Sequence, residues 1–234
     1  MRADLRLRGE HLDAGTAAQW IGGLFAVGSL CFLVGPIPGF VVLVGERADG
    51  LVFFVGSLFF TSAAAWQWFR SDRSTWRIPG PRLRFARRRW RTDRGSSTLQ
   101  LAGTIFFNAT TFWALTTATG SGSYDRLVWR PDAFGSVCFL ASGWIAYVLV
   151  SGRLMCRPPR TSDGRIALVN LLGCVAFLLS ALAGYVLPTS GEPVNVALVN
   201  ATTSLGALGF LGGALLLARD GRNLRRASRD ARQG

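Results

Sequence analysis

Uncharged polar side chains recur inside the long apolar stretches of this 234-residue chain, and they are its first candidates for chemistry. Asn108 and Asn170 lie in two of these stretches, and Asn200 and Thr202 lie in the last one. Amide and hydroxyl oxygens can line a narrow polar path through a membrane or coordinate a cation. The same groups form routine hydrogen bonds between membrane helices, worth about 0.6 kcal/mol each. The sequence favours this packing role, with the polar path as the alternative.

The groups that usually perform catalysis are missing from the apolar cores, which contain no Asp, Glu, Arg or His. The serines and threonines there have no neighbouring base that could activate them. His11 is the only histidine and has no partners at metal-ligand spacing, and the four cysteines are expected to be reduced thiols packed as small hydrophobes. We therefore predict no catalytic residues, no metal, no cofactor and no enzymatic activity.

The apolar stretches themselves predict the architecture. Each is close to the roughly 20 residues that a membrane-spanning helix needs. They predict an all-α, polytopic transmembrane bundle of about six spans, at residues 17–35, 51–69, 98–117, 134–151, 166–187 and 194–218.

The arginines predict the orientation of these spans. All 26 basic residues are Arg, and 23 of them fall in four segments: the N-terminal arm, the 70–94 loop, the 153–165 loop and the C-terminal tail. The three remaining loops hold only Arg47, Arg126 and Arg130, together with five acidic residues. Basic segments stay on the cytoplasmic side. We expect a multi-pass protein of the cell membrane with both termini in the cytoplasm.

The 70–94 loop interleaves ten arginines with Trp76, Phe85 and Trp90. Such spacing can bind single-stranded nucleic acid, but beside a bilayer it favours adhesion to anionic headgroups, with Trp at the interface. We predict that membrane lipids, and not nucleic acid, are the partners of this loop. The expected headgroup contacts are Arg84, Arg87, Arg88, Arg89 and Trp90.

A short motif recurs in every predicted span: a Gly, usually a small residue next, and a Phe four positions after the Gly. Residues i and i+4 share a helix face, so the Gly admits a neighbouring backbone and the Phe fills the space beside it. The spacings within successive pairs of spans suggest three repeated helical hairpins. The predicted helix-packing glycines are Gly28, Gly56, Gly103, Gly135, Gly173 and Gly206.

One stretch carries a resemblance. Residues 53–64 read FFVGSLFFTSAA and run on to Gln67. Together with the stretch around Gly28, this segment resembles the YrhK-like domain of bacterial membrane proteins, and residues 100–108 are similar to segments that accompany it. The resemblance covers residues 20–70 and implies a small helical-hairpin membrane domain. It implies no activity, substrate or catalytic residue.

These observations divide the chain into a cytoplasmic arm (1–16), a YrhK-like hairpin (17–69), a basic loop (70–97), a second hairpin (98–152), a loop with the third hairpin (153–218) and a basic tail (219–234). The expected role is that of a non-enzymatic scaffold or assembly protein, which binds other membrane proteins or itself through Gly-lined faces. The alternative is a transporter or channel for a small solute. A polar cavity that reaches the middle of the bundle would favour transport, and a sealed bundle with an exposed glycine face would favour assembly.

Overall fold

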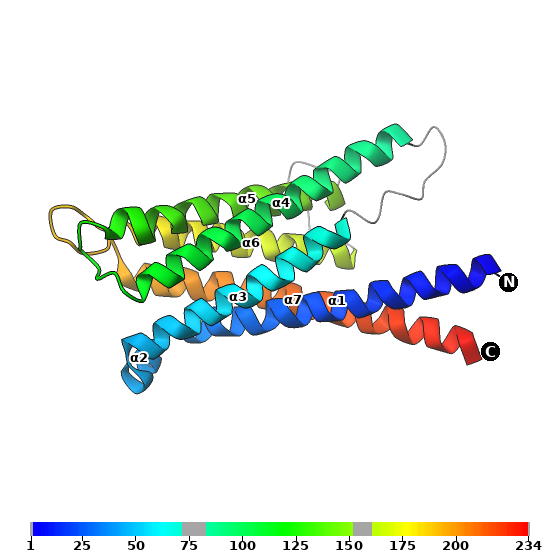
Figure 1. The fold of residues 1–234 in the computed structure, drawn as a ribbon, viewed down its shortest axis with the longest axis horizontal. Coiled ribbons are helices and arrows are strands. Elements are labelled where there is room, and N and C mark those ends of the chain that lie inside the picture. Colours follow the sequence, from blue (N-terminus) through cyan, green and yellow to red (C-terminus); the bar gives the residue numbers. More distant parts are fainter. Residues whose placement is uncertain (1, 72–82, 152–160, 234) are drawn as a thin grey trace.

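The computed structural model describes the backbone of residues 2–71, 83–151 and 161–233, and the side chains of residues 14–71, 93–151 and 161–230. The described chain is helical almost throughout (Figure 1). Six long helices carry the fold: α1 (Arg2–Val34), α3 (Glu46–Ser71), α4 (Leu83–Ala114), α5 (Arg130–Ser151), α6 (Ser162–Ala183) and α7 (Val196–Gln233). A short helix, α2 (Pro38–Val44), and a π-helical turn, η2 (Asp125–Trp129), join them.

The six long helices form a closed ring. Each packs against its two neighbours in the order α1, α3, α4, α5, α6 and α7, and α7 packs against α1 to close the ring. Both termini lie at the same end of the bundle, which we call the terminal end; the opposite end, where α2 and η2 lie, is the loop end (Figure 1). The predicted all-α bundle is confirmed.

Glycine and proline set the breaks between helices. Pro36 follows the end of α1, and Pro38 occupies the first turn of α2, where its missing N–H leaves no hydrogen bond unmade. Gly45 ends α2 with φ of +83°, a conformation that favours glycine. At the other end of the bundle, Thr161 caps α6 by accepting a hydrogen bond from the N–H of Gly164 at 3.2 Å.

Several helices extend beyond the predicted spans. The backbone of α1 is helical from Arg2 and that of α7 continues to Gln233, so the predicted arm and tail largely prolong spanning helices. Similarly, α4 begins at Leu83 and takes in much of the predicted basic loop. Charged residues do not end a helix. They limit only the part of it that can lie in apolar surroundings. The length of each apolar stretch therefore located the span but underestimated the length of the helix.

Within the part of the chain whose side chains are described, five helical segments are long and apolar enough to cross a membrane: Ala14–Val34, Glu46–Ser71, Asp125–Ser151, Ser162–Ala183 and Val196–Asp230. The sixth ring member, α4, contains Gln100 and Asn108 together with several hydroxyl residues, which lower its hydropathy. It packs between α3 and α5 like any other member of the ring.

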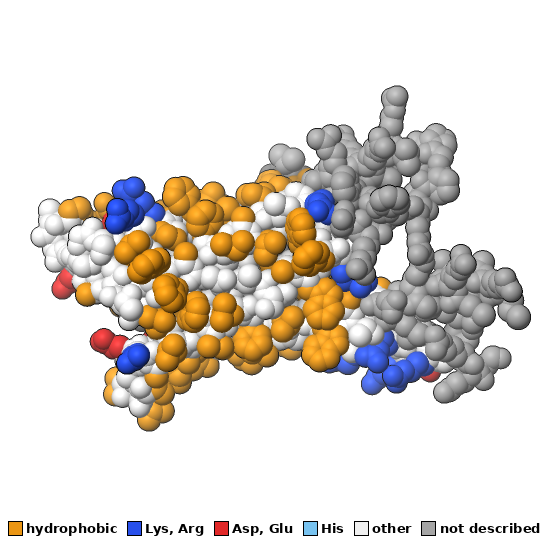
Figure 2. Space-filling view, in the orientation of Figure 1, with side chains coloured by type: hydrophobic (Ala, Val, Ile, Leu, Met, Phe, Trp, Pro, Cys, Tyr) orange, Lys and Arg blue, Asp and Glu red, His pale blue; other side chains and the backbone are white. Residues whose placement is uncertain are grey.

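Large apolar side chains point outwards along the middle of the bundle. Trp20 and Leu172 are 59% and 60% exposed, and Figure 2 shows hydrophobic side chains across the middle of the face it presents. Arginine side chains gather at its two ends (Figure 2). A soluble monomer rarely exposes so much contiguous apolar surface. With the five apolar helices, this surface identifies a multi-pass membrane protein.

Candidate functional site

The motif glycines pair across each hairpin. A Cβ atom built on Gly28 would lie 2.9 Å from the carbonyl oxygen of Gly56, and one built on Gly56 would lie 3.2 Å from that of Gly28. Gly103 and Gly135 face each other in the same way, at 3.0 and 3.1 Å. In the third hairpin, a Cβ on Gly173 would lie 3.0 Å from the carbonyl oxygen of Gly206. All six predicted glycines therefore lie at contacts within hairpins.

The phenylalanine of each motif packs over the glycine of its hairpin partner. The ring of Phe60 lies against Gly28, and the ring of Phe32 lies against Gly56. Similarly, Phe210 lies against Gly173 and Phe177 against Gly206. Any side chain larger than hydrogen at these glycines would occupy the space that the ring fills.

The six rings meet at the centre of the bundle in two stacked triangles. Phe32, Phe107 and Phe177 form one triangle, with ring centroids 5.9 to 6.4 Å apart. Phe60, Phe139 and Phe210 form the other, at 5.5 to 6.5 Å. Within each hairpin the two rings lie 4.9 to 5.7 Å apart and join the triangles. This cluster, the aromatic layer, has threefold pseudosymmetry about the bundle axis.

The residue after each motif glycine is small and fully enclosed, which explains why the motif needs a small residue there. Ser29, Ser57, Thr104, Ser136 and Ala207 are 0% exposed and Cys174 is 2% exposed. Two of them also form hydrogen bonds between hairpins. Ser57 shares a hydrogen bond with Thr111 at 3.0 Å, and Ser136 donates to the carbonyl of Phe177 at 3.3 Å.

A cavity of about 250 Å³ occupies the half of the bundle between the aromatic layer and the terminal end. Its wall is more apolar than polar, and we call it the polar cavity after the polar side chains that it contains. Its inner end is formed by Phe139 and Phe210 of the aromatic layer, with Phe25 beside them. All six ring helices contribute to its wall. Its polar lining residues are Gln67, Asp93, Ser96, Ser97, Gln100, Ser142, Asp163 and Asn170.

The serines of this wall are used in packing. Ser96 donates a hydrogen bond to the carbonyl of Ser142 at 2.9 Å, and Ser142 donates to the carbonyl of Ser96 at 2.8 Å. These reciprocal bonds fasten α4 to α5 at the side of the cavity. The two hydroxyl protons are therefore committed to backbone carbonyls.

Asn170 differs from these serines. Its Oδ1 atom is buried and finds no hydrogen-bond partner among the described residues. Its amide lies directly against Gly213, where a Cβ atom would collide with Oδ1. A buried amide oxygen without a hydrogen bond costs about 1–3 kcal/mol. The oxygen therefore faces α7, and only the rest of the Asn170 side chain lines the cavity.

The other predicted polar-path residues lie elsewhere. Asn108 follows Phe107 on α4, and Asn200 and Thr202 precede Gly206 on α7, so all three lie on the loop-end side of the motif in their helices. Thr202 donates to the carbonyl of Leu198 on its own helix at 2.6 Å. The Oδ1 of Asn108 is buried and, among the described residues, has no hydrogen-bond partner. The structure therefore does not bring these residues together with Asn170; the aromatic layer lies between them.

Most of the polar lining was missed by the sequence analysis. Gln67 and Gln100 were noticed only within a resemblance, and Asp93 and Asp163 lie in segments that the sequence analysis treated as basic loops. The only feature of the sequence that could have pointed to them is their position. All four lie near those ends of the predicted spans that the arginines assign to the cytoplasmic side. Periodicity does not show which of these residues face inwards, because Gln67, Asp93 and Asp163 lie at the ends of their apolar stretches, where too few turns remain to define a buried face.

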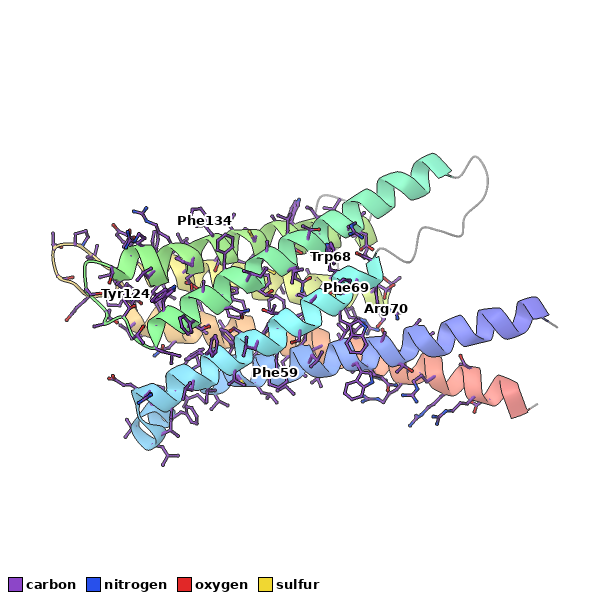
Figure 3. The ribbon with its side chains drawn as sticks, viewed as in Figure 1. Phe59, Trp68, Phe69, Arg70, Tyr124 and Phe134 are labelled. Carbon is purple, nitrogen blue, oxygen red and sulfur yellow. The ribbon has the colours of Figure 1, made fainter. Side chains whose placement is uncertain are left out.

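Aromatic and cationic groups also meet on the outer surface at the terminal end. The guanidinium of Arg94 lies 4.4 Å from the ring centroid of Trp68, whose indole N–H donates to Thr98 Oγ1 at 3.0 Å. Phe69 and Arg70 follow Trp68 at the end of α3 (Figure 3). The predicted headgroup contacts Arg84, Arg87, Arg88, Arg89 and Trp90 belong to the helical backbone of α4, but their side chains lie outside the described residues.

At the loop end, aromatic side chains of the turn between α4 and α5 contact the end of α6. The indole N–H of Trp129 donates to the carbonyl of Ala181 at 2.9 Å, and its ring meets that of Tyr185 edge-on at 4.8 Å. Tyr124, labelled in Figure 3, precedes the π-helical turn. Burial raises the pKa of the Tyr124 phenol, and the nearby Asp132 raises it further. The phenol is therefore neutral at physiological pH.

Comparison with protein-family models, curated proteins and solved structures finds nothing that matches this chain. The similarity of residues 20–70 to the YrhK-like domain stays a prediction.

Proposed function

We propose that this membrane protein binds a small polar solute in the polar cavity and carries it across the bilayer past the aromatic layer. The observation that carries the proposal is the one-sided cavity, which runs from the terminal end to Phe139 and Phe210 at the centre of the bundle. A volume of about 250 Å³ exceeds an engineered apolar cavity of about 150 Å³ that binds benzene. The carboxylates and amides of its wall suit a polar solute.

The aromatic layer supports a carrier more than an open channel. It separates the cavity from the loop-end half, so a solute in the cavity must displace or pass the six rings. On the far side, the Oδ1 of Asn108 is buried without a partner among the described residues, as the Oδ1 of Asn170 is on the near side. Two unsatisfied amides, one on each side of a thin barrier, suit a site that is exposed to alternate sides.

An assembly role is the second candidate, and it would need glycine faces that are free to dock partners. The six motif glycines are buried inside the hairpins, where phenylalanine rings already cover them. This burial favours the carrier over a scaffold. In the carrier no residue acts as a catalyst, so we propose that the protein is not an enzyme.

The charge distribution supports an orientation with the terminal end in the cytoplasm of the cell. Among the described residues, Arg70, Arg94, Arg165 and the arginines of α7 belong to the terminal end, whereas Arg47, Arg126 and Arg130 lie at the loop end with five acidic residues. Cytoplasmic loops carry such an excess of arginine. We propose that the terminal-end arginines and Trp68 contact anionic lipid headgroups.

The test is uptake by the purified protein in liposomes. Radiolabelled solutes of fewer than about twelve heavy atoms, drawn from cations, neutral polar molecules and anions, are offered to protein-containing and empty vesicles. We expect at least one class to exchange faster in the protein-containing vesicles, and Asn170→Leu, which replaces an amide of the cavity wall with an apolar group, to abolish the difference. No exchange of any class would refute a carrier.

A parallel measurement reports on binding alone. In a chain whose four cysteines are replaced by serine, Ala146→Cys places a thiol in the cavity wall. A solute that binds in the cavity should slow the reaction of this thiol with a neutral methanethiosulfonate. Protection without exchange would refute transport and leave a binding protein.

A further inference from the structure

The charges that line the polar cavity are opposite in sign to those around it. The chain has a formal net charge of +13, and arginines crowd the terminal end. Yet the two charged residues of the cavity wall are both carboxylates, Asp93 from α4 and Asp163 from the first turn of α6. Among the described residues that line the cavity there is no arginine.

The rest of the lining suits the apolar part of a cation. Phe25, Phe139 and Phe210 form the inner end, and aromatic faces attract cations and pack against hydrocarbon. The carboxylates lie nearer the mouth, since Asp93 and Asp163 are exposed and precede the inner lining residues on their helices by one to three turns.

We infer that the solute is a small organic cation, a primary or secondary amine with an apolar body. Its ammonium group is held by Asp163, and its body lies against the phenylalanine rings. This inference rests on the proposed function and names the substrate class of the same cavity. The amine is held only by ion pairing, hydrogen bonds and ring contacts, and no covalent step is involved.

Three size-matched probes separate charge from shape. Benzylamine, benzyl alcohol and benzoate share one ring and differ in carrying a positive charge, no charge or a negative charge at neutral pH. Each is titrated against modification of Ala146→Cys in the cysteine-free protein, in neutral detergent, with a neutral methanethiosulfonate. We expect benzylamine to protect at a concentration at least tenfold lower than either of the other probes.

Variants then assign the preference to the cavity. Asp163→Asn should raise the half-protecting concentration of benzylamine roughly tenfold, which corresponds to about 1.4 kcal/mol, because it removes the charged hydrogen-bond acceptor of the ammonium group. Its effect on benzyl alcohol should be small. Asp230→Asn, an equal charge change at an exposed site of α7, is the matched control and should leave all three titrations unchanged.

The outcomes separate the two proposals. Equal or better protection by benzoate or benzyl alcohol would overturn the cation preference and leave the carrier standing. Loss of protection in Asp230→Asn as large as that in Asp163→Asn would show that only the general surface charge matters, and would also overturn it. Failure of all three probes, with another solute class protecting and exchanging, would refute the amine but not the carrier.

Discussion

The ring of Phe60 packs against Gly28, so that a Cβ atom added to Gly28 would lie 2.7 Å from Phe60 Cδ2. In the same way, a Cβ atom added to Gly56 would lie 3.1 Å from Phe32 Cδ2. The glycine of each helix thus makes room for the phenylalanine of the other. Because the two helices are antiparallel and side chains lean towards the N-terminus of their own helix, the two rings converge and touch, one in each triangle. Three copies of this exchange bring six rings together, which is how a five-residue motif builds the aromatic layer.

Adding one methyl group at this contact should destabilise the bundle. Gly28→Ala would set a Cβ 2.9 Å from the carbonyl oxygen of Gly56, which is backbone and cannot rotate away. We expect a loss on the order of 1–3 kcal/mol from overpacking. The control is Gly23→Ala on the same helix, where nothing lies within 4 Å and stability should be unchanged or raised by up to about 1 kcal/mol. Thermal unfolding in detergent, followed by tryptophan fluorescence, measures both; equal melting temperatures would argue against the glycine contact.

The neighbouring phenylalanines Phe106 and Phe107 make a second matched pair. Phe107 is 6% exposed and belongs to the aromatic layer, whereas Phe106 is 37% exposed on the outer side of α4. When Phe106 is truncated, lipid can take the place of the lost ring on the outer surface. When Phe107 is truncated, lipid cannot fill the cavity left at the centre of the bundle. Phe107→Ala should therefore destabilise by about 2–4 kcal/mol and Phe106→Ala by much less. A larger effect at Phe106 in the same unfolding assay would be inconsistent with a central aromatic layer.

The sequence predicted the hairpin contacts because the motif is local. A Gly and a Phe at i and i+4 specify one helix face, and the repetition of the pair in six helices indicates that those faces meet. The closure of the six rings into two triangles was not predicted. It depends on the order of helices around the ring, which no short-range pattern encodes.

The cavity escaped prediction for a related reason. Asp93 and Asp163 follow no apolar periodicity, and both are near residues that positive-inside counting assigns to loops. Asn170 was identified as polar, but its grouping with Asn108 and Asn200 assumed that polar residues at similar depth share one path. The aromatic layer divides that set, and only a three-dimensional arrangement shows on which side each residue lies.

The proposed orientation can be measured directly. Gly122 and Thr189 are exposed residues of turns at the loop end and should accept short epitope insertions without disturbing any helix. In intact cells, antibody or protease should reach epitopes at these two positions from outside, and should reach one at the C-terminus only after the membrane is opened. Protection of either loop-end epitope in intact cells would contradict an orientation with the termini in the cytoplasm.

The contact between Asn170 and Gly213 offers the sharpest test of the cavity. A Cβ on Gly213 would occupy the place of the Asn170 amide oxygen, so Gly213→Ala must push that amide into the cavity or separate α6 from α7. Gly212→Ala adds the same methyl group one residue earlier, where its nearest neighbour, Val169 Cγ1, lies at an ordinary 3.4 Å. We expect Gly213→Ala to lose solute protection of Ala146→Cys by at least tenfold, and Gly212→Ala to retain it. Asn170→Ala combined with Gly213→Ala removes the collision and should recover the melting temperature of the Gly213→Ala protein without recovering solute binding. Recovery of binding in the double variant would mean that Asn170 only fills space, and its amide would have no part in holding the solute.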